Sequence, residues 1–98
     1  MERGGYVYIL TNKHHNVLYT GVSSRLRSRV WDHKNKVNPK SFTARYNVNK
    51  LVYYEFHLTI LEAISREKQI KAGSRKKKLD LINQFNPEWR DLFDEAED

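Results

Sequence analysis

The sequence has 98 residues, no cysteine and a formal net charge of +6, as expected for one small basic domain. The absence of cysteine excludes disulfides, thiolate catalysis and cysteine-based zinc sites, and it is typical of a reducing cytoplasm. The chain has no stretch approaching the ~20 apolar residues of a membrane span, and no apolar run typical of a signal peptide. We therefore expect a cytoplasmic single domain over residues 1–98, with its core at residues 5–92 and no contact with a membrane.

The positive charge is concentrated in residues 1–90. This part contains all 18 Lys and Arg and seven acidic residues, a net charge of +11, whereas five of the 12 acids lie in the last eight residues. A body this basic favours polyanions, and nucleic acid is the usual partner of a basic patch. A basic surface that is merely solvated is the alternative. We expect the acidic tail, residues 93–98, to be frayed.

The first elements predicted along the chain are two strands joined as a hairpin. Tyr6–Thr11 is dense in β-branched and aromatic residues, which predicts a strand. Residues 12–16 are polar and predict a turn, and Val17–Thr20 predicts the second, shorter strand. Gly21 closes the hairpin and permits tight backbone geometry there.

A helix is predicted next, capped by Ser23 or Ser24 and running to about Asn35. Its inner face is predicted to carry Leu26, Val30 and Trp31. Its first turns are basic, with Arg25, Arg27 and Arg29. Cations at a helix N-terminus oppose the helix dipole at a cost of a few tenths of a kcal/mol each, roughly. Such a local conflict points to function, and a solvated basic face is the alternative.

The second half predicts a loop, one strand and two helices. Residues 36–48 contain Asn38-Pro39 and no periodicity, so a loop is expected, and Leu51–Phe56 predicts a third strand. Thr59 and Glu62 form a capping box that opens a helix ending near Ala72 and Gly73. Ser74 caps a further helix to about Gln84, whose predicted core residues are Leu79, Ile82 and Phe85. The fold class predicted from these elements is α+β.

One carboxylate falls within an apolar helix face. At 100° per residue from Ile60, Ile64 falls at about 40°, Ile70 at about 280° and Glu67 at about 340°, inside the apolar stripe. An unpaired carboxylate there would be costly, so Glu67 needs a metal ion, an arginine or several hydrogen-bond donors. A buried Glu–Arg pair without any function is the structural alternative.

Five blocks of the sequence are informative together: Val7–Leu10, Leu18–Gly21, Arg29–His33, Ala44–Tyr46 and Ser65–Lys71. In this order and spacing they resemble the GIY-YIG nuclease domain, and they closely resemble the small stand-alone bacterial proteins of the UPF0213 family. The resemblance extends from Gly5 to Leu92. It implies a three-stranded antiparallel sheet flanked by about three to four helices. One departure is that Tyr6 stands where the signature has its first glycine.

The resemblance also implies roles for individual residues. It assigns catalysis to Tyr8, Tyr19, Arg29 and His33, and it makes Glu67 the ligand of a single Mg²⁺ or Mn²⁺ ion. Basic residues outside this set are expected to contact the nucleic-acid backbone: Arg27, Arg45, Lys71, Arg75, Lys76 and Lys77.

The hypothesis that follows is a metal-dependent endonuclease that hydrolyses phosphodiester bonds in DNA, including branched or single-stranded DNA, in repair or processing. Tyr8 would orient or deprotonate the attacking water, which requires neighbouring cations to lower a phenol pKa that is normally about 10. A non-catalytic nucleic-acid-binding module is the alternative, with a protein partner that supplies specificity. A purely structural basic protein is a third possibility, which leaves the position of Glu67 unexplained.

Overall fold

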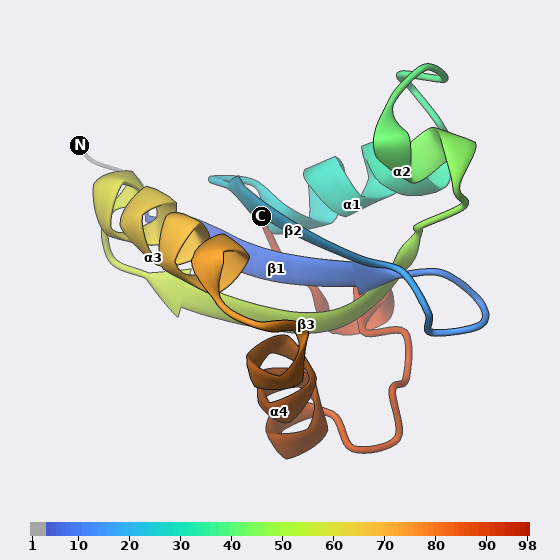
Figure 1. The fold of residues 1–98 in the computed structure, drawn as a ribbon. Coiled ribbons are helices and arrows are strands. Elements are labelled where there is room, and N and C mark those ends of the chain that lie inside the picture. The colour runs from blue at the N-terminus through green and yellow to red at the C-terminus, as the bar shows by residue number, and fades with distance from the viewer. Residues whose placement is uncertain (1–3) are drawn as a thin grey trace.

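The computed structural model describes residues 4–98 and has a three-stranded antiparallel sheet at its centre (Figure 1). The strands are β1 (Gly5–Thr11), β2 (Leu18–Ser23) and β3 (Lys50–His57), in the order β2-β1-β3. The helices are α1 (Leu26–Lys34), α2 (Phe42–Arg45), α3 (Ile60–Ala72), α4 (Arg75–Phe85) and the 3-10 turn η1 (Phe93–Glu95). The predicted α+β class and antiparallel sheet are confirmed. No helix within residues 4–98 is long and apolar enough to cross a bilayer.

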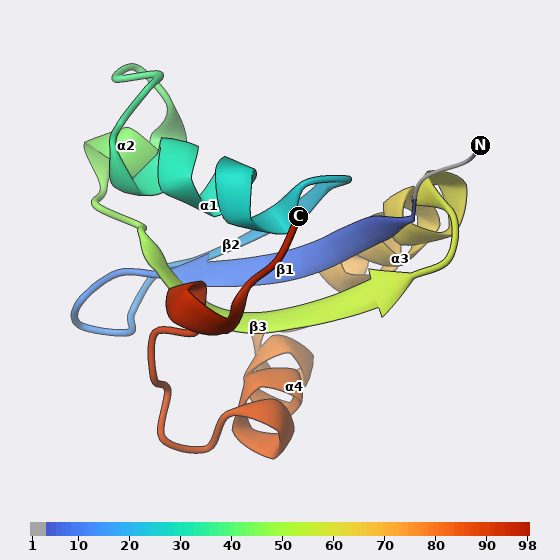
Figure 2. The same cartoon turned by 180° about the vertical axis from the view of Figure 1, so that it is seen from behind.

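Both faces of the central strand β1 are buried, because helices cover the sheet on both sides (Figures 1 and 2). Tyr8 and Leu10 pack in one apolar cluster with residues of α1. Val7 and Ile9 point to the opposite face and pack with residues of α3 and α4. This alternation follows from the two-residue period of a strand, and it sends Tyr8 to the α1 side.

The predicted caps of α3 and α4 are confirmed. The Thr59 side chain accepts a hydrogen bond from the Glu62 amide, and the Ser74 side chain accepts one from the Lys77 amide. The prediction for α1 is wrong, since the helix begins at Leu26 after Arg25 and has no side-chain cap.

Two predictions about the core are also wrong. Trp31 is 51% exposed, because it lies about 100° around α1 from the buried Val30. Phe85 is 45% exposed although Ile82 is fully buried. The helix α4 packs against β3, an edge strand of the sheet, so it buries only a narrow stripe.

The segment between α1 and β3 is more ordered than the predicted loop. Ser41 caps the short helix α2 by accepting a hydrogen bond from the Ala44 amide at 3.3 Å. Thr43 and Ala44 on this helix are buried, whereas Phe42 and Arg45 are exposed. The short helix α2 therefore packs against the rest of the protein through the face that carries Thr43 and Ala44.

The acidic tail is packed and not frayed as predicted. Its backbone is held by Arg27, whose guanidinium donates to the Phe93 carbonyl at 2.9 Å and lies 4.3 Å from the centre of the Phe93 ring. Ala96 is 4% exposed in the same cluster as Tyr8. Asp98 accepts a hydrogen bond from the Ser28 amide at 2.8 Å, and the last residues lie along the start of α1 (Figure 2). Apolar residues within the tail explain why its charge does not keep it in solvent.

Candidate active site

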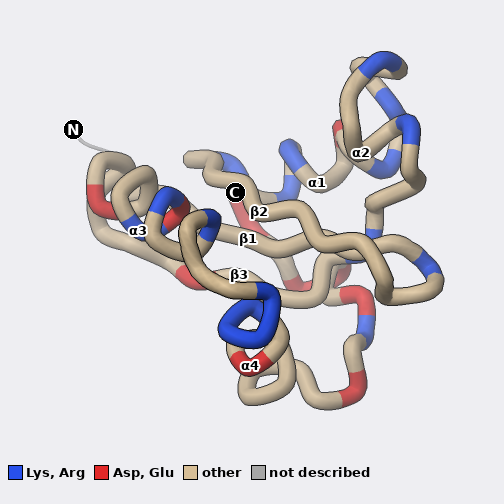
Figure 3. Tube along the Cα trace, in the orientation of Figure 1, with Lys and Arg blue, Asp and Glu red and all other residues tan. Residues whose placement is uncertain are grey.

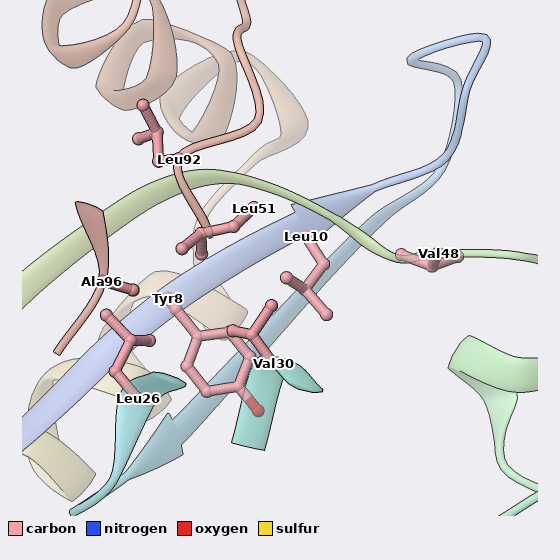
Figure 4. Packing of buried hydrophobic residues seen from close by; sticks show 8 residues of the cluster. All are labelled: Tyr8, Leu10, Leu26, Val30, Val48, Leu51, Leu92 and Ala96. Carbon is pink, nitrogen blue, oxygen red and sulfur yellow. The ribbon is translucent and has the colours of Figure 1, made fainter. Parts of the chain in front are cut away.

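Tyr8 lies at the centre of the candidate site and is almost fully buried, at 1% exposure. Figure 4 shows its ring beside Leu26 and Val30. The phenol passes directly over Gly21, its partner on β2, where an added Cβ would lie 2.4 Å from the Tyr8 hydroxyl oxygen. The glycine is therefore required for space and not, as its position in the hairpin suggested, for unusual backbone geometry, since no glycine within residues 4–98 has a positive φ.

A short hydrogen-bonded chain connects Tyr8 to α2. The Tyr8 hydroxyl lies 3.0 Å from His33 Nε2, and His33 Nδ1 lies 2.8 Å from Thr43 Oγ1. Both contacts fit one neutral tautomer, in which Nε2 accepts from Tyr8 and Nδ1–H donates to Thr43. Thr43 is 2% exposed. The sequence predicts a loop over residues 36–48 and no role for Thr43, although Ser41 is an available helix-cap signal.

Burial sets the protonation of this pair. Burial, and then the neighbouring Tyr19, raise the pKa of the Tyr8 phenol well above its usual range, and Arg29 opposes them without reversing the shift. The expectation that cations lower the pKa of Tyr8 is therefore wrong. Burial and then Arg29 lower the pKa of His33. At neutral pH the pair consists of a neutral phenol and a neutral imidazole.

Tyr19 and Arg29 line a cavity directly beside this pair. The Tyr19 ring lies 5.5 Å from the His33 ring and 6.5 Å from the Tyr8 ring, centre to centre. The cavity has a volume of about 250 Å³ and is lined by Tyr19, Arg29, Asp32, His33, Val37, Asn38 and Ser41. A water molecule takes about 30 Å³ in the liquid, so a hydrated anion such as a phosphate group fits beside Arg29.

Glu67 comes from α3, on the face of the sheet opposite to α1. Its side chain is only 13% exposed, as its position in the apolar stripe predicted, and it pairs with Lys71 Nζ at 3.1 Å. Within residues 4–98 no arginine pairs with it, so the alternative of a buried Glu–Arg pair is not realised. Glu67 is close enough to Tyr8 for its charge to contribute to the raised pKa of the phenol.

The chemistry of Glu67 suits a hard cation. Residues 4–98 contain no cluster of three or more His, Asp or Glu that could enclose a metal ion. One carboxylate is nevertheless a sufficient protein ligand for Mg²⁺, which keeps several waters and takes further oxygens from substrate phosphates. The competing cation is removable, because the Lys71 side chain is 52% exposed.

The residues predicted to contact nucleic acid come from four helices: Arg27 from α1, Arg45 from α2, Lys71 from α3, and Arg75, Lys76 and Lys77 from α4. Basic residues lie on the first turn of α4 and, separately, between α1 and α2 (Figure 3). Arg45, Arg75, Lys76 and Lys77 are all exposed. Arg75 also donates to the Asn16 carbonyl, and Lys76 also pairs with Asp80 at 3.3 Å. Arg27 is exposed, and one nitrogen of its guanidinium donates to the Phe93 carbonyl of the tail.

Comparison with known proteins gives the same class as the fold and the site. The family model of the GIY-YIG catalytic domain matches residues 4–80. A UPF0213 protein of Clostridium perfringens is 45% identical over 78 residues, which is 80% of this chain and 82% of that protein. A UPF0213 protein of Staphylococcus saprophyticus is 40% identical over 79 residues, covering 81% of this chain and 94% of that one.

A solved structure shares the fold. The solution NMR structure of a UPF0213 protein from Bacillus halodurans superimposes with a TM-score of 0.56 at 26% identity, covering 91% of this chain and 93% of that one. The chain belongs to the GIY-YIG family of nuclease domains and, within it, to the UPF0213 proteins. Nuclease domains of this family generally use a divalent metal ion.

Proposed function

We propose that this protein is a metal-dependent endonuclease that hydrolyses phosphodiester bonds in DNA, with branched and single-stranded DNA as the first substrates to test. The observation that supports this most is the hydrogen bond between Tyr8 and a neutral His33 beside Arg29, within electrostatic range of Glu67. The absence of cysteine agrees with a cytoplasmic setting.

Tyr8 and His33 together serve as the general base. The phenol does not ionise by itself at neutral pH, because its pKa is raised. As water attacks phosphorus, the Tyr8 oxygen accepts the water proton while the phenolic proton moves to His33 Nε2, 3.0 Å away. Thr43 accepts from Nδ1–H, which holds the tautomer that leaves Nε2 free to accept.

Arg29 and Tyr19 bind the phosphate group in this mechanism. Arg29 neutralises charge on the nonbridging oxygens, and the Tyr19 hydroxyl donates a hydrogen bond to the phosphate or the water. Glu67 holds Mg²⁺ or Mn²⁺ once Lys71 has moved away from its carboxylate. When bound, such an ion polarises a phosphate oxygen and stabilises the leaving 3′ oxygen.

Replacement of Glu67 tests the proposal. Glu67→Gln should abolish cleavage of a panel of branched, single-stranded and duplex DNA in Mg²⁺ or Mn²⁺, while binding to the same DNA is retained. Glu62→Gln is the matched control, because it removes an exposed carboxylate from the same helix, and it should cleave like the parent. Equal cleavage by Glu67→Gln and the parent would mean that the activity is a contaminant.

A nucleic-acid-binding module that acts with a protein partner is the second candidate. The ion pair between Glu67 and Lys71 favours it, because a neutralised carboxylate attracts a metal ion less strongly. If the parent binds the whole panel but cleaves none of it at any metal concentration, this candidate replaces the first. The partner would then supply both specificity and chemistry.

A further inference from the structure

A row of aromatic rings leads from the candidate active site onto the surface of α2. The Tyr19 and Phe42 rings are stacked, with centres 6.4 Å apart and planes 24° apart. The Phe42 and Tyr46 rings follow at 4.9 Å and 45°. The row therefore begins at a residue that lines the cavity of the proposed phosphate site and ends on the outside of the protein.

The outer two rings, Phe42 and Tyr46, are exposed and are not the residues that anchor α2. Phe42 is 47% exposed and Tyr46 is 50% exposed. The helix α2 is anchored instead by Ala44 and Thr43, which are 6% and 2% exposed, and by the hydrogen bond that His33 donates to Thr43. Besides its contact with the neighbouring ring, each residue keeps about half of its surface in solvent, and this exposed part is available to stack on a ligand.

The surroundings of the two rings favour an anionic partner. Residues 33–54 contain five Lys or Arg and no Asp or Glu. Arg45 lies between the two aromatic residues in sequence, and its guanidinium is 5.8 Å from the centre of the Tyr46 ring. Aromatic faces interleaved with cations are the features by which proteins bind the stacked bases and phosphates of single strands. An apolar protein segment would match the rings but not the charge.

We propose that Phe42 and Tyr46 form a stacking site for an unpaired nucleobase of a DNA strand whose phosphate lies beside Tyr19 and Arg29. This inference rests on the proposed function for the position of the phosphate. A base within a duplex is stacked on its neighbours, so the two rings bind only a base that is unpaired, as in single-stranded or branched DNA. The site thereby selects the strand that enters the active site.

The test measures binding in the absence of divalent metal, so that no cleavage is needed. Labelled single-stranded DNA and a duplex of the same sequence are titrated with the parent, Phe42→Ala, Phe42→Leu and Phe56→Ala. Phe56 is a matched control, because it is 54% exposed and lies at the end of β3 remote from α2. Phe42→Leu retains apolar bulk next to the buried Thr43 but lacks a π-face.

Both Phe42 variants should weaken binding to the single strand by roughly 5- to 150-fold, the loss expected for one stacked base. Duplex binding, and all binding by Phe56→Ala, should be unchanged. A 2-aminopurine in the single strand should be quenched by the parent and less so by Phe42→Leu. The inference would be overturned if Phe42→Leu weakened binding to single strand and duplex equally, or weakened neither. It would also be overturned if the parent did not bind single-stranded DNA.

These outcomes separate the inference from the proposed function. If Glu67→Gln abolishes cleavage but Phe42→Leu changes no binding constant, the nuclease proposal stands and the stacking site falls. If the parent cleaves no DNA but Phe42→Leu weakens binding to the single strand and not to the duplex, the stacking site stands as part of a non-catalytic binding module.

Discussion

Gly21→Ala is the sharpest perturbation of the candidate site. The added Cβ would lie 2.4 Å from Tyr8 Cζ and 2.4 Å from its hydroxyl oxygen, whereas ordinary contacts begin at 3.4 Å. The phenol must therefore move by about 1 Å, and the Tyr8 ring is almost fully buried, so its neighbours resist. Overpacking of this kind typically costs about 1–3 kcal/mol, and each kcal/mol lowers the Tm of a domain this size by roughly 4–8 °C.

Gly21→Ala should lower the rate of cleavage as well as the stability. A shift of about 1 Å in a reacting group can cost about 10²-fold in rate, because the bond from Tyr8 to His33 no longer has its geometry. Thermal unfolding and cleavage of single-stranded DNA, measured well below the Tm, separate the two effects. Gly73→Ala is the control, since its Cβ would meet no atom closer than 3.3 Å.

Two results would refute the reasoning about Gly21. A Gly21→Ala protein with the parent Tm would show that the space beside Tyr8 is not filled as described. A Gly21→Ala protein that is less stable but cleaves at the parent rate would show that the position of the phenol does not matter for the reaction. In the second case the role given to Tyr8 would need to pass to another residue.

Two further predictions concern pH and metal affinity. The lowered pKa of His33 means that the neutral form predominates above about pH 6.5, so its contribution to stability is present there and is lost as the pH falls through the lowered folded pKa. The rate of cleavage should accordingly fall at acid pH with an apparent pKa below about 6.5. An apparent pKa above about 6.5, or an unchanged acid fall in His33→Gln, would contradict the proton transfer from Tyr8 to His33. Lys71→Met removes the cation paired with Glu67 and should lower the Mg²⁺ concentration for half-maximal cleavage, measured by metal titration, whereas an unchanged midpoint would mean that the ion pair does not compete with metal.

Local sequence signals predicted the elements around the site well. The strands, the caps at Thr59 and Ser74, and the inward position of Glu67 each depend on residues adjacent in sequence or on one helical period. The start of α1 was mispredicted because Ser23 accepts from the Arg25 amide at 3.0 Å and forms a turn before the helix, a local bond that competes with capping.

Properties that depend on tertiary burial could not be predicted in the same way. The mechanism expected from the resemblance requires cations to lower the pKa of Tyr8, but the desolvation imposed by packing outweighs Arg29. The packing of the tail could not be predicted, because Phe93 and Ala96 are isolated apolar residues among acidic ones and form no periodic pattern. The contact with Arg27 exists only once α1 has folded beside the tail. The bond from Thr43 to His33 likewise joins two helices that the sequence does not place together.

The proposed mechanism requires the phenol of Tyr8 and the carboxylate of Glu67 to act on one substrate from opposite faces of the sheet. Tyr8 points to the α1 face of the sheet, and Glu67 belongs to α3, which packs on the opposite face. Groups on opposite faces of a sheet are normally separated by its backbone and side chains. Here the phenol lies over Gly21, which has no side chain, on the edge strand β2, and the charge of Glu67 contributes to the raised pKa of the phenol. In the proposed mechanism, Tyr8 reaches the phosphate at this edge from one face of the sheet and Glu67 reaches it from the other.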